Sequence, residues 1–318
     1  MIKYDIPIRE LIEDFLNGID LSPLTKALYK KTLDYFIYWV IKNDRPVKNI
    51  TTADLINYRD HLRNRGLSPA TIDNYIASIK SFYSWLVKYD FCNINPAQPI
   101  KKEKKVTGLY MRQCLNINQV KSLIKSTGNK TILEKRNRAI IKLMVYTGLR
   151  CIEIRRLNYG DIKHLPDRTF IQIWRKGSRE AGDSLPLPQT VEKSINDYLD
   201  SRIDLITEKT PVFISHSPRN KGNRLQTQYI SKMIKAHLRK IGLTSRQYSA
   251  HSLRHTAASL AHLAGAKLYE IQFMLAHSKL SQTEQYLRSI GKSIGNEESA
   301  IYKIEKLIKK ALENKSEL

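Results

Sequence analysis

The sequence predicts a mostly helical α+β protein with two domains: a four-helix bundle, then a mainly helical domain with a small antiparallel sheet. Three observations support this prediction. Apolar residues recur at helical spacing through the first hundred residues, a basic stretch with prolines follows, and two short apolar runs later flank a polar turn. The 318 residues suffice for two ordinary domains, and 42% hydrophobic residues can form a packed core.

Four helices are expected in the N-terminal part. Residues 8–16 carry apolar side chains at positions i, i+3, i+4, i+7 and i+8, which is the stripe of an amphipathic helix. The other three helices open with a serine N-cap before proline or with a pattern that resembles a capping box: Ser22-Pro23, Ser68-Pro69, and Thr51 with Asp54. The last of the four runs to about Lys88, so a compact four-helix bundle is predicted.

Residues 96–112 interrupt this pattern with prolines, a glycine and a run of lysines, which is the composition of a linker between domains. The lysines are expected to contact a phosphate backbone: Lys101, Lys102, Lys104 and Lys105. An ordinary solvated connector is the alternative. The predicted boundaries are 1–98 for the helical domain, 99–113 for the basic linker, 114–292 for the second domain and 293–318 for a C-terminal helix.

The second domain is predicted to be mixed. Asn116 with Gln119 marks a helix start, and residues 170–174 and 184–187 form a predicted hairpin. Further helices are expected through 139–146 and near 191–201, 226–241 and 252–263. The C-terminal segment places four apolar residues on one helical face: Ile301, Ile304, Ile308 and Leu312. A lone helix of this length is marginal in water, so this face needs an apolar groove.

The charge of the chain favours a polyanionic partner. Lys and Arg number 54 against 30 Asp and Glu, which gives a net charge of +24. A ribosome-associated protein or a generally basic proteome would also account for that charge. The three cysteines, Cys92, Cys114 and Cys151, show no C-x-x-C pairing, so neither a zinc site nor a disulfide framework is expected. No metal and no cofactor are expected. The chain has neither a membrane-length apolar run nor a signal-peptide pattern, and a cytoplasmic protein without membrane contact is expected.

A set of residues suited to cutting a phosphodiester lies in the second domain. Gly148-Leu149-Arg150 is followed about a hundred residues later by His251-Ser252-Leu253-Arg254, and then by His277 and Tyr286. Arginine binds two phosphate oxygens through its planar guanidinium and stays charged. Histidine can move a proton, and a tyrosine hydroxyl can form a reversible phosphate ester. The set therefore predicts strand cleavage without metal or ATP.

These motifs resemble those of the tyrosine recombinase (integrase) family. Thr147-Gly148-Leu149-Arg150 is similar to the family's first arginine box, in which Arg150 would clamp a phosphate oxygen and Glu153 would orient its neighbours. Lys176 lies at the hairpin turn, where the family has its catalytic lysine, the general acid for the 5′-oxygen. Arg175 lies beside it and is expected to contact DNA.

The second half of the resemblance lies downstream. His251 would handle the proton of the tyrosine, and Arg254 would complete the phosphate clamp. Leu275-Ala276-His277 resembles the third box, although the family commonly has glycine where this chain has Ala276; His277 would donate a hydrogen bond to the phosphate. Tyr286, nine residues after His277, is the expected nucleophile. His255 is expected to be structural.

The resemblance also implies an organisation. The helical bundle would be the core-binding domain that clamps DNA, and the C-terminal helix would be exchanged between protomers. A helix packed on its own domain is the alternative. The expected partners are double-stranded DNA with inverted half-sites, a homotetramer on synapsed DNA, and accessory DNA-bending or directionality factors. The expected function is site-specific recombination through a 3′-phosphotyrosyl intermediate, in integration and excision or in dimer resolution. Type IB topoisomerase-like relaxation and a non-catalytic DNA-binding protein are the alternatives.

Overall fold

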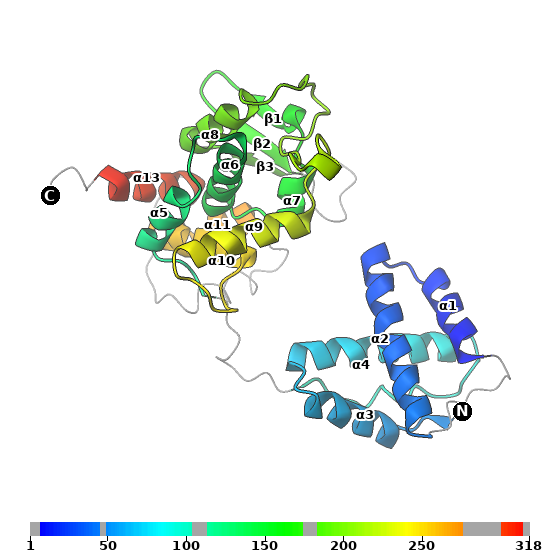
Figure 1. Ribbon diagram of the computed structural model, residues 1–318. Coiled ribbons are helices and arrows are strands. Elements are labelled where there is room, and N and C mark those ends of the chain that lie inside the picture. Colours follow the sequence, from blue (N-terminus) through cyan, green and yellow to red (C-terminus); the bar gives the residue numbers. More distant parts are fainter. Residues whose placement is uncertain (1–6, 45–48, 104–112, 174–182, 276–299, 314–318) are drawn as a thin grey trace. The chain divides into compact units, whose positions relative to one another are not determined.

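The computed structural model describes residues 7–44, 49–103, 113–173, 183–275 and 300–313, and the chain divides into two compact units (Figure 1). Unit 1 comprises Met1–Leu109 and unit 2 comprises Tyr110–Leu318. The division falls within the stretch that the sequence predicts as a linker. Within the described ranges, no helix is long and apolar enough to cross a membrane.

The first unit is a bundle of four helices, as predicted. Their bounds are α1 (Ile8–Gly18), α2 (Pro23–Lys42), α3 (Thr52–Asn64) and α4 (Pro69–Lys88). The side-chain oxygens of Ser22 and Ser68 accept hydrogen bonds from the backbone N–H groups three residues on, and Thr51 with Asp54 forms a capping box. All three start signals are therefore confirmed. Each satisfies backbone donors that a helix start would otherwise leave without partners.

The chain stays attached to this bundle beyond α4. Ile100 is buried in the core of the bundle, and Lys80 Nζ donates a hydrogen bond to its carbonyl at 2.8 Å. Glu103 accepts two hydrogen bonds from the guanidinium of Arg63, at 2.7 and 3.0 Å. The first part of the predicted linker thus lies on the bundle surface. Lys101 and Lys102 are exposed there, and Lys104 and Lys105 lie outside the described residues.

The second unit places helices around a small antiparallel sheet. Its first elements are α5 (Ile117–Lys125), α6 (Ile132–Thr147), α7 (Cys151–Arg156), η2 (Tyr159–Asp161), β1 (Ile162–His164), β2 (Thr169–Ile173) and β3 (Asp183–Pro186). They are followed by α8 (Gln189–Leu199), η3 (Pro218–Asn220), α9 (Thr227–Lys240), α10 (Ala250–Leu263), α11 (Leu268–Leu275) and α13 (Ala300–Glu313). The predicted hairpin is β2–β3, with Ile171 opposite Leu185. A third strand, β1, which the sequence did not predict, pairs with β2.

Helix α6 forms the centre of the second unit. It packs against α8 and α10, and residues 139–141 and 143–147 are all buried. Because the second half of this helix is buried on nearly all sides, it needs neighbours around its circumference. It ends at Gly148, whose left-handed backbone (φ +69°) turns the chain directly into Arg150 and α7. A buried helix at the centre of the unit therefore leads directly into the first arginine box.

The C-terminal helix α13 packs on its own unit in this single chain (Figure 1). Ile301, Ile304 and Ile308 are at most 1% exposed and belong to the same apolar core as α6 and α10. Lys303 Nζ lies 3.4 Å from the carboxylate of Glu270 on α11. The side chain of Leu312 is outside those that the structure describes. The predicted apolar face is thus covered within the chain, and the exchange of α13 between protomers stays a prediction.

Candidate active site

Arg150 lies at the N-cap of α7 and is held by Glu153. The carboxylate of Glu153 accepts hydrogen bonds from the backbone N–H of Arg150 at 2.7 Å and from its Nη1 at 2.8 Å. The side chain of Glu153 is 4% exposed, whereas that of Arg150 is 40% exposed. One edge of the guanidinium is therefore fixed, and the group remains open to solvent. A phosphate oxygen could bind at that open side.

Arg254 is the second arginine and is only 1% exposed, on the buried side of α10. Its Nη1 donates a hydrogen bond to the carbonyl of Gly148 at 2.7 Å, and its Nη2 donates to the carbonyl of Leu275. These bonds join Arg254 to residues that are 106 and 21 positions away from it along the chain. Gly148 is two residues before Arg150, so the bond to its carbonyl fixes the second arginine to the first arginine box.

His251 lies in the first turn of α10 and is exposed. Its ring meets the ring of His255 edge to face, with centroids 4.9 Å apart and planes at 86°. His251 and Arg254 are one helical turn apart, so they are neighbours along α10, with His251 exposed and Arg254 buried. The start of α10 is fixed by Ser252, whose Oγ accepts from Ser249 N and donates to the carbonyl of Gln247, both at 3.0 Å.

The structure thus brings together four of the expected site residues, Arg150, Glu153, His251 and Arg254. The other expected residues lie outside the described ranges: Lys176, Arg175, His277 and Tyr286. The last described residue before them is Leu275, and its carbonyl is bound by Arg254. Since His277 follows two residues later, the chain that leads to His277 starts from a point fixed on the buried arginine.

The carbonyls of Gly148 and Leu275 are acceptors for Arg254 that sequence reasoning missed. Every residue has a carbonyl, so no residue type or spacing marks these two. The nearest signal is Gly148 itself, because a glycine after a long apolar helix predicts a left-handed helix end. Within the described ranges, no group of three or more His, Cys, Asp or Glu side chains could hold a metal ion.

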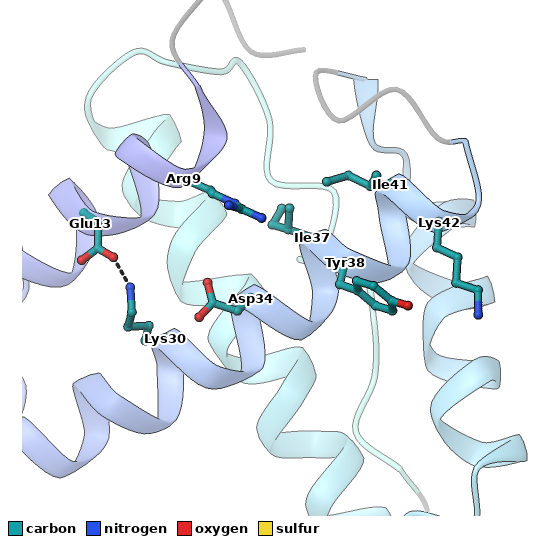
Figure 2. Close-up of a pocket in the computed structure, with 8 residues that line it drawn as sticks. All are labelled: Arg9, Glu13, Lys30, Asp34, Ile37, Tyr38, Ile41 and Lys42. Atoms are coloured by element: carbon teal, nitrogen blue, oxygen red, sulfur yellow. Dashed lines mark hydrogen bonds and ion pairs between the residues drawn. The ribbon is translucent and has the colours of Figure 1, made fainter.

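A separate surface hollow in the first unit contains none of the expected site residues (Figure 2). It lies between α1 and α2 and is lined by Arg9, Glu13, Lys30, Asp34, Ile37, Tyr38, Ile41 and Lys42. An ion pair between Lys30 and Glu13 crosses from one helix to the other. The hollow is lined by both basic and acidic side chains, so it does not have the cationic character that a phosphate site requires.

Replacing Gly148 with alanine is expected to impair cleavage as well as stability. The new Cβ would lie 2.6 Å from Leu275 Cδ2, in a backbone conformation (φ +69°) that L residues rarely adopt. The strain should lower the free energy of unfolding by about 1–3 kcal/mol. It should also displace both carbonyls that hold Arg254. Gly222→Ala is the matched control, since it has φ +80° and nothing within 4 Å. Thermal unfolding and DNA cleavage rates check this, and equal effects of the two variants on cleavage would contradict it.

A buried arginine bonded to the first arginine box, with a histidine one helical turn before it, fits an enzyme that acts on phosphodiesters. Comparison with known proteins identifies the family to which the chain belongs. The model of the phage integrase family matches residues 113–291, and that of the phage integrase N-terminal SAM-like domain matches residues 8–91. The chain therefore belongs to the phage integrase family, the tyrosine recombinases.

Two relatives support this assignment. The tyrosine recombinase XerD of Listeria monocytogenes is 30% identical over 88% of this chain and 94% of its own length. That of Oceanobacillus iheyensis is 31% identical over 86% of this chain and 92% of its own. The resemblance seen in the sequence is confirmed, and the chain is a tyrosine-type site-specific DNA recombinase. The topoisomerase and the non-catalytic alternatives are not favoured.

Solved structures share the fold. A XerH site-specific recombinase in a post-cleavage complex with palindromic difH substrate has a TM-score of 0.73 at 21% identity, and the match covers 89% of this chain and 81% of that one. The integrase of transposon Tn1549 in complex with circular intermediate DNA has a TM-score of 0.71 at 16% identity, over 95% of this chain and 100% of that one. At these identities the likeness concerns the fold alone.

Proposed function

We propose that this recombinase cuts one DNA strand at a phosphate held by Arg150 and Arg254, with Tyr286 as the nucleophile. The observation that carries the proposal is the hydrogen bond from Arg254 to the carbonyl of Gly148, because it ties Arg254 to the segment that leads into Arg150 and so supports a shared site. Two preorganised guanidinium groups stabilise the charge that develops on the phosphoryl oxygens in the transition state. Glu153 keeps Arg150 oriented for that task.

Each proton and bond in the reaction has a proposed place. The phenolic oxygen of Tyr286 attacks phosphorus while its proton passes to His251, and the bond from phosphorus to the 5′-oxygen breaks. Lys176 protonates that oxygen, so a 5′-hydroxyl leaves and a 3′-phosphotyrosyl ester remains. His277 donates a hydrogen bond to the phosphate. Attack by a 5′-hydroxyl reverses the steps, and since the ester conserves the bond energy, rejoining needs no ATP.

The proposed partner is duplex DNA with inverted half-sites. The net charge of +24 supports many phosphate contacts, and the related XerH structure contains a palindromic substrate. Exposed Lys101 and Lys102 are proposed contacts of the bundle, whereas Lys104, Lys105 and Arg175 rest on the sequence alone. We further propose a homotetramer on two synapsed sites, accessory DNA-bending or directionality factors, and a cytoplasmic location.

The chemistry is tested with a nicked duplex that traps the cleaved strand on the protein. The duplex carries half-sites selected from a randomised pool by binding to this protein. The wild-type chain is expected to form a covalent protein–DNA adduct in excess EDTA and without nucleotide, because arginines rather than a metal neutralise the phosphate. Denaturing gel electrophoresis detects the adduct. Strict dependence of the adduct on added magnesium would contradict the proposal.

A further inference from the structure

Lys235, on α9, is bound to the loop that precedes the catalytic helix. Its ammonium group donates to the backbone carbonyls of Thr244 at 3.0 Å, Ser245 at 2.5 Å and Tyr248 at 2.9 Å. A lysine ammonium has three N–H donors, so its donors match these three acceptors. Burial, and then the neighbouring Arg239, lower the pKa of Lys235. The three carbonyl acceptors distinguish Lys235 from an ordinary solvated lysine.

The bound loop leads directly into His251. Helix α10 begins at Ala250, and His251 is its second residue. The carbonyl of Tyr248 lies three residues before His251, so Lys235 holds the backbone next to the first turn. The other side of the same junction is held by Ser252 through Gln247 and Ser249. A displacement of this loop would therefore reach His251 before any other residue of the candidate site.

We propose that Lys235 is a positioning residue that orients His251 by fixing the loop between α9 and α10. The inference rests on the proposed role of His251 in proton transfer. Arg254 lies one turn further along α10 and has its own anchors, the carbonyls of Gly148 and Leu275. Loss of Lys235 should therefore disturb the proton-transfer group while leaving the phosphate clamp in place.

The kinetic test compares Lys235→Met with Lys240→Met in the full-length protein on the nicked duplex. Lys240 is exposed at the end of the same helix, and its side chain has no hydrogen-bond partner among the described residues, so its variant matches the loss of charge. At saturating DNA, Lys235→Met should slow covalent cleavage by about 10- to 100-fold, the effect of a small misplacement of a catalytic group. Lys240→Met should weaken DNA binding alone, and Lys235→Arg should recover part of the rate because it can still donate to carbonyls.

Two further measurements separate positioning from general structural support. The imidazole NMR signal of His251, assigned by its loss in His251→Ala, should shift in Lys235→Met and not in Lys240→Met. In a His251→Ala background, Lys235→Met should slow residual cleavage by less than about 2-fold, because the two residues act through one group.

The inference is overturned if the rate and the His251 signal are both unchanged in Lys235→Met. It is also overturned if Lys235→Met slows cleavage equally in the wild-type and His251→Ala backgrounds. The same holds if Lys235→Met lowers stability without shifting the NMR signal of His251. If His251→Ala leaves no measurable cleavage, the NMR signal of His251 in Lys235→Met alone decides whether Lys235 is a positioning residue. Wild-type cleavage by His251→Ala would instead contradict the proposed function, so the two failures are distinguishable.

Discussion

Tyr286→Phe is expected to bind DNA normally and to form no covalent adduct. The substitution removes one hydroxyl group, which is the proposed nucleophile, and leaves the ring and all charges in place. Loss of a nucleophile typically lowers the rate by about 10⁴-fold or more, so the adduct should fall below detection. Denaturing gels of the nicked duplex measure the adduct, and a binding titration measures the affinity for intact duplex.

The controls for Tyr286 come from the other 16 of the 17 tyrosines in the chain. Tyr269 lies on α11 and is 61% exposed, and Tyr302 lies on α13. Both are near the site in sequence, but neither follows His277 at the interval of nine residues. Tyr269→Phe and Tyr302→Phe should therefore cleave like the wild type. A persistent adduct in Tyr286→Phe, with its loss in one of these variants, would assign the nucleophile to another tyrosine.

Arg254→Ala is expected to reduce both stability and cleavage. The truncation leaves the buried carbonyls of Gly148 and Leu275 without this donor. Each lost bond should lower the free energy of unfolding by about 1–3 kcal/mol. Removal of one preorganised charge-stabilising group typically costs about 10²- to 10³-fold in rate. Chemical denaturation measures the first effect. Single-turnover cleavage, at a temperature where the variant remains folded, measures the second.

Arg136→Ala is a control matched in burial. Arg136 is also 1% exposed, donates to the carbonyl of Ile214 at 3.0 Å, and contacts the hydroxyl of Tyr229. It belongs to the structural core on α6 and to none of the expected site motifs. Its loss should destabilise the unit by a similar amount while cleavage by the folded fraction remains close to wild type. Equal loss of cleavage in the two variants would mean that Arg254 acts through stability alone.

The sequence could predict those features that depend on local chemistry. Ser22-Pro23, Ser68-Pro69 and Thr51 with Asp54 set helix starts through bonds within one turn, so short patterns reveal them. The pairing of Arg150 with Glu153 is also local, because the two residues are three positions apart. The order of the boxes predicted the family, since each box keeps its residue types and spacing.

Features that depend on tertiary contacts could not be read in this way. The carbonyl acceptors of Arg254 carry no residue signature, and they come from segments far apart in the chain. The attachment of Glu103 to Arg63 is likewise invisible in a basic, proline-rich stretch whose composition predicts a solvated linker. Strand β1 is only three residues long, and its pairing with β2 makes it a strand.

The packing of α13 has a consequence for the expected exchange between protomers. To donate this helix, a protomer must first expose Ile301, Ile304 and Ile308, at roughly 1.5–3 kcal/mol for each side chain. A neighbour with the same groove restores the same contacts, so the net change in contact energy is close to zero. The balance then depends on the effective concentration of one groove near another chain's helix. In dilute solution each protomer would keep its own helix. Two protomers held side by side on one duplex would present each groove to the other's helix at a high effective concentration, so an exchange would cost little free energy.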